Sequence, residues 1–369
     1  MELMSVSRLH HPDKPFSMDS VPKPEPTGND VLVRVRACGM VPNLGNVIQY
    51  GDIAPEFPLP EFPAILGLDP AGEIAAVGPD VLELTPGQRV YVNPARSCGS
   101  CSWCRKDLPM ECDSYTFAGY FGFGPGSRRV FHRYPSGGFA EYLVAPSASI
   151  VVLPDEVTFE QAGRFGYLGT AYAALRRAQA GSDTSVLING ATGTLGVGAV
   201  MVALAMGVPK ILAVARNENL LGQLKDLAPR RIITHSNDTG PCTEWARAQT
   251  AGRGPDVMLE ARSPGTSTES TTSAMASVAR GGRIVTVGGD PTHFEIDPIW
   301  FMLNQITYVG SLWFTTAQAE EMAAMVAAGT LDLTPFRHQR FPLDQVTQAL
   351  AACSNREHGG FVNVVVNPC

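Results

Sequence analysis

The pattern of apolar and polar residues changes along the chain. In residues 1–154, short runs such as Val31–Arg36 and Arg89–Val92 are separated by glycine and proline turns. Val31–Arg36 alternates apolar and polar side chains, which is typical of a strand with one buried face. Many short strands joined in this way predict an irregular β barrel or sandwich in the N-terminal region.

The middle of the chain, residues 155–295, has a different pattern. The apolar run Val186–Ile188 is followed by a helical run at Val197–Met206 and by a second apolar run at Lys210–Ala215. Further strand-like runs, with helix-like segments between them, are Arg231–Thr234, Asp256–Glu260 and Arg283–Val287. Strands that alternate with helices predict an α/β domain with a parallel, doubly wound sheet.

The last part of the chain predicts one more strand of this sheet and a return to the N-terminal region. Ile306–Gly310 is the expected last strand, and Thr316 is the expected N-cap of a helix at Ala317–Ala328. A second helix is expected at about Leu343–Cys353. The closing strand, Phe361–Val366, is expected to rejoin the N-terminal domain.

Three glycines mark the turn between the first strand and the first long helix of the middle region. Gly190, Gly193 and Gly196 are spaced three residues apart. Glycine allows both a sharp strand-to-helix turn and a close approach of the backbone to an anion, and the helix N-terminus supplies free N–H donors. In a strand–helix–strand context this turn predicts a dinucleotide-binding site. A glycine-rich turn without a ligand is the alternative.

The end of the second strand predicts which dinucleotide binds. NAD-preferring folds place an acidic residue about 20 positions after the glycines, where it binds the adenosine ribose. Here Ala215, Arg216 and Asn217 stand at that place. Ala215 does not repel a 2′-phosphate, and Arg216 can bind it through charge-assisted hydrogen bonds. The sequence therefore predicts NADP(H), with a solvated arginine at a strand end as the alternative.

Cysteine spacing predicts a metal site. Four of the eight cysteines fall within fifteen residues, at Cys98, Cys101, Cys104 and Cys112. Three cysteines at i, i+3 and i+6 can surround one ion, and the fourth completes a tetrahedron of thiolates, which suits a structural zinc. Buried free cysteines or disulfides are the alternatives.

Composition narrows the class of protein. Hydrophobic residues make up 44% of the chain and charged residues 17%, and the net charge of −7 is spread without runs. No basic stripe appears, which argues against nucleic acid and against an anionic membrane surface as partners. The N-terminus has no apolar core of signal-peptide length, and no apolar run reaches about 20 residues. We therefore expect a soluble, cytoplasmic protein.

Together these features resemble the medium-chain dehydrogenase/reductase superfamily, the zinc alcohol dehydrogenase-like proteins. The resemblance rests on the four-cysteine lobe (98–112), GGFAEY at 137–142, the glycine turn at 190–196 and GGRIVTVGG at 281–289. It implies a GroES-like catalytic domain at residues 1–154 and a Rossmann domain at residues 155–295. Residues 296–369 are then expected to add the last Rossmann strand and return to the catalytic domain, with a cleft between the two domains. It also implies a homodimer that pairs through the edge strand near Ile306–Gly310.

The resemblance also implies which residues bind the cofactor. Thr170 matches the position next to the nicotinamide. The expected cofactor-binding residues are Gly190, Thr192, Gly193, Thr194, Leu195, Gly196, Ala215, Arg216, Asn217, Val287, Gly288, Leu312 and Trp313.

The catalytic zinc of the superfamily is the point where this sequence departs from the resemblance. Its zinc-using members hold the ion with three ligands, and the matching residues here are Cys38, Leu68 and Gly166. Leucine and glycine offer no donor to zinc, and Cys38 with the nearby Asp69 does not make a three-ligand site. Cys38 is then better explained as a small buried apolar residue. The Gly-x-Asp-x-x-Gly pattern at 67–72 instead resembles the zinc-independent quinone and enoyl reductases.

These observations predict an NADP(H)-dependent reductase of a small or mid-sized, apolar carbonyl compound, conjugated enones included. Hydride transfer without zinc needs a hydrogen-bond donor for the oxygen that gathers charge. Tyr50, Tyr120 and Tyr167 are candidates, although each can be simply a packed tyrosine. The predicted catalytic residues are Tyr50, Asp69, Thr170 and Cys38.

Two other functions stay open. One is a zinc-dependent alcohol dehydrogenase with an atypical site at Cys38 and Asp69, and the other is a non-catalytic nucleotide-binding protein. The segment from Tyr115 to Tyr134, rich in aromatic residues and glycine, is either a mobile loop over the substrate pocket or a surface excursion with its own apolar cluster.

Overall fold

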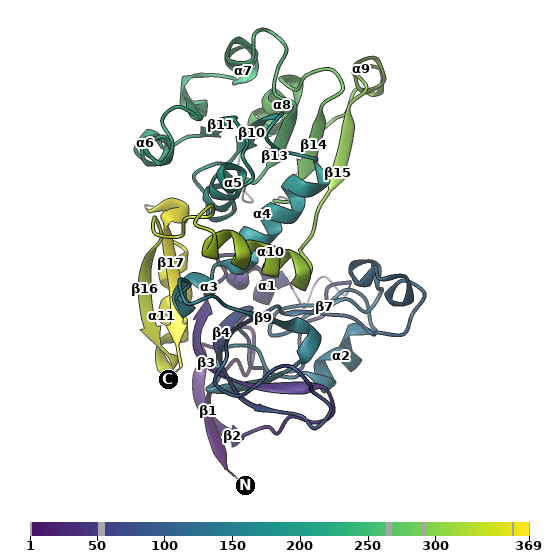
Figure 1. The fold of residues 1–369 in the computed structure, drawn as a ribbon, viewed down its shortest axis with the longest axis vertical. Helices are drawn as coiled ribbons and strands as arrows, with labels where there is room; N and C mark the ends of the chain where they lie inside the picture. Colours follow the sequence, from purple (N-terminus) through teal and green to yellow (C-terminus); the bar gives the residue numbers. More distant parts are fainter. Residues whose placement is uncertain (1, 51–55, 263–267, 289–292, 356–357, 369) are drawn as a thin grey trace.

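The computed structural model describes residues 2–50, 56–262, 268–288, 293–355 and 358–368, without the side chain of Tyr50. Two β-sheets dominate the molecule, a parallel one in the upper part of Figure 1 and a mostly antiparallel one in the lower part. Both chain ends lie in the lower part. The α/β class with two sheets, predicted from the spacing of apolar residues, is confirmed.

The parallel sheet has six strands in the order β12-β11-β10-β13-β14-β15. Its strands are β10 (Ser185–Asn189), β11 (Lys210–Ala215), β12 (Ile232–Ser236), β13 (Val257–Glu260), β14 (Arg283–Thr286) and β15 (Thr307–Gly310). All five pairings are parallel. The strand order reverses between β10 and β13, as in a doubly wound dinucleotide fold.

Helices cover both faces of this sheet. Successive residues of β10 alternate between two apolar clusters: Val186 and Ile188 pack in one, and Leu187 packs in the other. The first cluster contains residues of α4 (Phe165–Arg177), α5 (Thr194–Ala205) and α6 (Glu218–Leu227). The second contains residues of α7 (Thr243–Gln249) and α8 (Thr268–Ala276). The apolar runs are continuous because both faces of the strands are buried.

The lower sheet has seven strands, which come from both the N-terminal and the C-terminal parts of the chain. Its order is β16-β17-β3-β4-β5-β9, with β8 paired to β3. The strands are β3 (Asp30–Gly39), β4 (Asp69–Val77), β5 (Arg89–Val92), β8 (Tyr142–Pro146), β9 (Ile150–Val152), β16 (Arg337–Pro342) and β17 (Val362–Asn367). Val365 and Val366 of β17 pair with Gly39 and Cys38 of β3. This pairing confirms that the closing strand returns to the N-terminal domain.

Smaller elements complete both parts of the molecule. Two strand pairs lie outside the main sheet: β1 (Leu3–Arg8) with β2 (Ser17–Pro22), and β6 (Ala95–Arg96) with β7 (Thr116–Phe117). The other helices are α1 (Leu44–Tyr50), α2 (Ser127–Arg133), α3 (Phe159–Ala162), α9 (Pro298–Asn304), α10 (Thr316–Ala327) and α11 (Val346–Cys353). None of the helices within the described ranges is long and apolar enough to cross a bilayer.

One helix start differs from the prediction. The N-cap of α10 is Thr315, not Thr316. The Thr315 hydroxyl accepts a hydrogen bond from the Gln318 N–H, and the Gln318 side chain accepts one from the Thr315 N–H. Two adjacent threonines are equally good caps by residue type, and the glutamine three residues later selects Thr315 through this capping box.

Candidate active site

A cleft of about 1060 Å³ lies between the parallel sheet and the N-terminal domain. Residues at or just beyond the carboxyl ends of the parallel strands form one side of it, among them Asn189, Ala215, Ala261 and Val287. Open α/β sheets bind ligands at this edge, where the strand order reverses. The opposite side comes from α1, the start of β4 and the segment after β7.

The glycine turn forms the centre of the first side. Gly190 has a φ of +81°, and its N–H and that of Ala191 both donate to the Val214 carbonyl. Gly193 is the N-cap of α5 and has no side chain to bond the first helical N–H groups. These donors therefore face the cleft without a side-chain competitor.

Gly196 has a different role from the other two glycines. It is the one predicted cofactor residue that does not line the cleft. A Cβ atom at this position would lie 2.2 Å from the Gly190 carbonyl oxygen and 2.6 Å from the Ala191 Cα. Gly196 thus allows α5 to pack closely against the turn, the function of the third glycine in this motif.

At the end of β11, Ala215 and Arg216 line the cleft. The Arg216 side chain is exposed, and no described carboxylate lies within ion-pair distance of it. Asn217 also lines the cleft, but its side-chain oxygen caps α6 by accepting the Leu220 N–H at 3.1 Å. Of the two polar residues here, Arg216 is thus the one whose side chain is uncommitted in the described part of the chain.

Asp69 lies at the other end of the cleft, almost completely buried. Its carboxylate accepts the Tyr91 hydroxyl at 2.8 Å. Burial raises the pKa of Asp69 to about 7, although the Tyr91 bond, the Arg164 charge and the Gly166 N–H each lower it. Asp69 therefore holds a proton for part of the time at neutral pH.

Gly166 and Leu68 surround this carboxyl group. A Cβ at Gly166 would lie 2.3 and 2.4 Å from the two Asp69 carboxylate oxygens. The Asp69 carboxylate thus occupies the space into which any side chain at position 166 would point. Leu68 lines the cleft beside it.

Cys38 is completely buried and does not line the cleft. Its thiol contacts the Gly39 carbonyl at 3.8 Å, and burial raises its pKa well above the usual value. This environment agrees with the interpretation of Cys38 as a packed, apolar residue. Tyr50 ends α1, and its side chain falls outside the described residues.

Two of the predicted hydrogen-bond donors, Tyr120 and Tyr167, line the cleft near Asp69. Burial raises the pKa of both hydroxyls. Each also lies close enough to Asp69 for the negative charge of the carboxylate to raise the tyrosine pKa further. Both therefore remain protonated donors at neutral pH. Thr170 also lines the cleft, and its hydroxyl donates to the Gly166 carbonyl at 2.7 Å.

The segment from Tyr115 to Tyr134 forms part of the cleft wall. Phe117 and Phe121 line the cleft, and Phe117 and Tyr115 belong to the main apolar cluster of the molecule. The ring of Phe117 contacts that of Trp313 with centroids 4.8 Å apart. The segment is thus a packed wall of the pocket, and its aromatic residues do not form a separate cluster.

The sequence profile of the alcohol dehydrogenase GroES-like domain matches residues 27–155, and that of the zinc-binding dehydrogenase domain matches residues 194–328. An alcohol dehydrogenase of Geobacillus stearothermophilus is 31% identical, over 86% of this chain and 87% of its own length. The L-threonine 3-dehydrogenase of a Chelativorans species (strain BNC1) is 30% identical, over 95% of this chain and 96% of its own.

The chain belongs to the medium-chain dehydrogenase/reductase superfamily. A zinc-binding dehydrogenase structure from Sinorhizobium meliloti 1021, bound to NADP, shares its fold with a TM-score of 0.82. That structure is 23% identical, and the match covers 100% of both chains.

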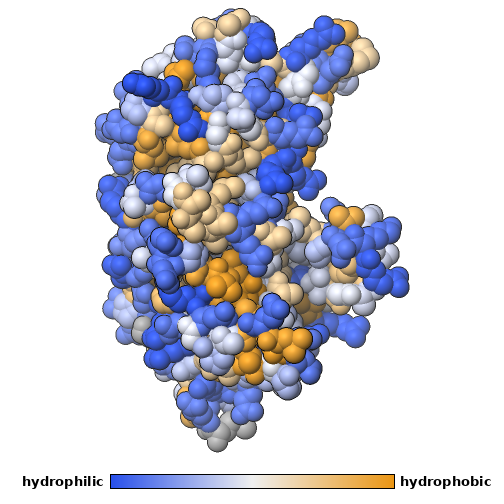
Figure 2. All heavy atoms as spheres, viewed as in Figure 1, coloured by the Kyte–Doolittle hydropathy of each residue, from blue (hydrophilic) through white to orange (hydrophobic). Residues whose placement is uncertain are grey.

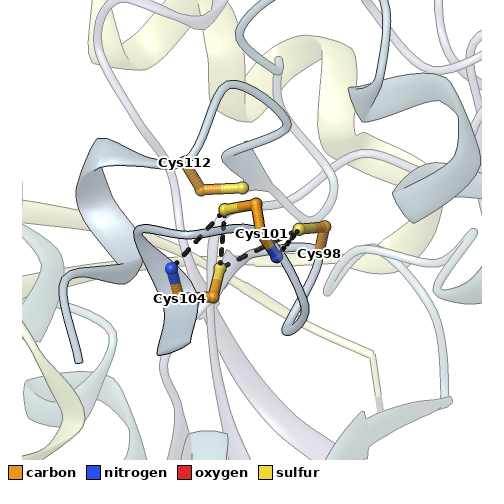
Figure 3. Close-up of side chains that lie close together, drawn as sticks. All are labelled: Cys98, Cys101, Cys104 and Cys112. Atoms are coloured by element: carbon orange, nitrogen blue, oxygen red, sulfur yellow. Dashed lines mark hydrogen bonds between the residues drawn. The ribbon is translucent and has the colours of Figure 1, made fainter. Parts of the chain in front are cut away.

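The geometry of the four-cysteine lobe could hold a metal ion. The sulfur atoms of Cys98, Cys101, Cys104 and Cys112 all lie within 4.8 Å of one another (Figure 3). The backbone N–H groups of Ser100 and Cys101 lower the pKa of Cys98, which favours its thiolate, whereas burial raises the pKa of Cys112. Four thiolates fit a tetrahedral, closed zinc site, which stabilises the lobe and leaves no position for substrate.

The positions that hold a catalytic zinc in other members do not fit a metal here. Cys38 supplies one buried thiol, Leu68 supplies no donor, and the space beside Gly166 is occupied by Asp69. Within the described ranges, the zinc lobe is the one place where three or more His, Cys, Asp or Glu ligand atoms gather.

Several residues of the cleft were missed from the sequence. Asn189, the last residue of β10, and Arg262, which follows β13, both line the cleft. The Glu260 side chain behind them binds Asn189 at 3.0 Å and Arg262 at 3.1 Å. Their place at the carboxyl ends of parallel strands was the available signal. Ser354 and Gly359, between α11 and β17, also line the cleft. No sequence signal indicates that this distant segment returns to the cofactor side.

Proposed function

We propose that this protein transfers hydride between NADP(H) and a small or mid-sized, apolar carbonyl compound, without a catalytic zinc ion. Aldehydes, ketones and conjugated enones are the expected substrates. One observation carries the proposal: the same cleft joins a dinucleotide-type glycine turn to an aromatic pocket whose polar groups are hydroxyls, asparagine amides and the buried carboxyl group of Asp69.

The preference for NADP(H) is supported by the end of β11. Ala215 brings no negative charge to the site, and the uncommitted guanidinium of Arg216 borders the cleft. A guanidinium binds a 2′-phosphate through two parallel hydrogen bonds. Asp238 also borders the cleft and would repel that phosphate, so the contribution of Arg216 must exceed this repulsion.

The substrate end supports an uncharged substrate. Of the described residues that line the cleft, the cations are Arg216 and Arg262, both from the parallel-sheet domain. Arg164 lies 5.5 Å from the Tyr167 ring, but it is buried, bonded to the Gly360 carbonyl and absent from the cleft lining. No described cation therefore lines this end of the cleft as a partner for a substrate carboxylate. This argues against an amino acid such as the one named for the L-threonine 3-dehydrogenase relative.

The chemistry requires a hydride, a binding site for the developing oxyanion and a proton. When bound, NADPH supplies the hydride. The hydroxyls of Tyr120 and Tyr167 can donate hydrogen bonds to the substrate oxygen as charge gathers on it. Asp69, in the same end of the cleft, can hold the proton that the product needs. The reduction then adds one hydride to carbon and one proton to the enolate or alkoxide.

The experiment follows nicotinamide absorbance with NADPH and NADH over aldehydes, ketones and enones, and with NADP⁺ and NAD⁺ over alcohols, before and after mild chelation. We expect NADPH-dependent reduction of neutral carbonyls that survives chelation. Arg216→Ala should raise the KM for NADPH at least about tenfold, or about 1.4 kcal/mol, and the exposed Arg230→Ala serves as the matched control. Chelator-sensitive alcohol oxidation would instead support a zinc dehydrogenase, and cofactor binding without turnover would support a non-catalytic protein.

We also propose a homodimer. Strand β15 is an edge strand, paired with β14 alone among the described strands. In the adjacent α9, Ile299, Met302 and Leu303 are more than 60% exposed. Figure 2 shows apolar atoms on the projection that α9 forms at the upper right. An unpaired edge beside exposed apolar side chains favours a second copy, and sedimentation of the purified protein tests this.

The clustered thiols of the zinc lobe further support a reducing compartment such as the cytoplasm. Expression with a fluorescent tag and fractionation would test this location.

A further inference from the structure

Trp313 lies where the chain crosses from the parallel sheet to α10, and it lines the cleft. Its indole N–H donates to the side-chain oxygen of Asn93 at 3.1 Å. Asn93 follows β5 and is almost completely buried. Its oxygen also accepts the Ala95 N–H at 3.1 Å, and its amide donates to the Phe314 carbonyl at 3.4 Å. The Asn93 side chain thus holds this crossing segment by two accepted hydrogen bonds and one donated one.

Aromatic rings fix the indole on its other sides. The Phe314 ring stacks on it with centroids 4.7 Å apart and planes at 29°. The Phe117 ring meets it at 60° and 4.8 Å. Phe314 in turn lies against Gly169, where a Cβ would come within 2.5 Å of the ring. Trp313 is only 9% exposed, so the part of the indole that stays free faces the cleft in one orientation.

The wall beside Trp313 is aromatic as well. Phe117, Tyr120 and Phe121 line the cleft, and the rings of Phe117 and Phe121 are 5.4 Å apart. Aromatic faces bind flat π systems by offset or edge contacts, which stabilise them beyond the burial of apolar area alone. A saturated ring of the same size gains the burial but not these contacts.

We infer that Trp313 is a specificity-determining residue that selects a planar aryl group conjugated to the reacting carbonyl, and that Asn93 positions its indole. The inference rests on the proposed reductase function and names its substrate class more closely.

The test compares trans-cinnamaldehyde, which carries a planar phenyl ring, with (E)-3-cyclohexylprop-2-enal, which carries a puckered cyclohexyl ring in its place. In the unmodified holoenzyme we expect the ratio of kcat/KM values to favour the aryl compound by about three- to tenfold. Trp313→Leu should bring the ratio close to one. Trp313→Phe, which keeps an aromatic face, should retain part of the preference. Trp245→Leu, a tryptophan stacked on His235 and not lining the cleft, is the control and should leave the ratio unchanged.

The role of Asn93 is tested with the same ratio of kcat/KM values, because a general loss of stability would not change this ratio. Asn93→Leu removes the acceptor of the indole N–H and should lower the ratio, whereas Asn93→Asp keeps that oxygen and should preserve it. If both variants keep the kcat/KM ratio of the unmodified protein and change only the melting temperature, Asn93 has no positioning role.

Calorimetric binding of trans-cinnamamide and its cyclohexyl analogue to the NADP⁺-loaded protein separates this inference from the proposed function. Aryl-selective binding that Trp313→Leu abolishes, without any NADPH oxidation, would support the inference and refute the reductase. NADPH-dependent reduction with no aryl preference, or with one that Trp313→Leu does not change, would refute the inference and leave the reductase standing.

Discussion

Asp69→Asn tests whether the buried carboxyl group of the cleft titrates near neutrality. The amide has nearly the same shape and keeps an oxygen that can accept the Tyr91 hydroxyl, now 2.8 Å from the carboxylate. It removes only the ability to ionise. The effect of the substitution on stability should therefore depend on pH.

The sign follows from the two pKa values of Asp69, which are about 7 in the folded protein and 3.8, the ordinary value of an exposed aspartate, in the unfolded chain. Between them the unfolded chain releases its proton while the folded protein keeps it, so stability falls as pH rises from about 4 to about 7 and then levels off. The linkage relation gives a loss of about 2 to 3 kcal/mol between pH 5 and pH 8 from this group alone. Asp69→Asn should lack this loss.

The assay is equilibrium urea unfolding of both proteins at pH 5, 6, 7 and 8 with zinc held constant. The difference in unfolding free energy between the two should change by about 2 to 3 kcal/mol over this range, in favour of the variant at high pH. Asp30→Asn is the matched control, because Asp30 also accepts a tyrosine hydroxyl, that of Tyr134 at 2.9 Å, outside the cleft. Parallel pH curves for the unmodified protein and Asp69→Asn would refute the reasoning.

Three further outcomes are expected. Elemental analysis should find one zinc per chain, lost in Cys98→Ser, because the four sulfur atoms of the lobe lie within 4.8 Å of one another; two zinc ions per chain would contradict this prediction. Gly196→Ala should abolish cofactor binding measured by calorimetry, since its Cβ would lie 2.2 Å from the Gly190 carbonyl oxygen, and unchanged affinity would argue against the turn as the phosphate site. Cys38→Ala should lower kcat by less than about threefold, because removing a packed thiol leaves only a small cavity, whereas near-complete loss would restore a metal-binding role.

The sequence determined the features that depend on local spacing. Buried strands such as Lys210–Ala215 were located with the same bounds as β11, because a continuous apolar run between glycines is a local property. The glycine turn followed in the same way from backbone sterics. The gathering of the four lobe cysteines was predicted because their spacing alone brings the thiols of a short loop together.

The tertiary structure alone decided how the substrate end is arranged. Asp69 occupies the space beside Gly166, although nearly a hundred residues separate them, and Asn93 holds Trp313 across an even longer distance in sequence. Such contacts depend on how two sheets are placed against each other, and no local pattern encodes that placement. The raised pKa of Asp69 has the same origin, because desolvation depends on everything packed around the carboxyl group.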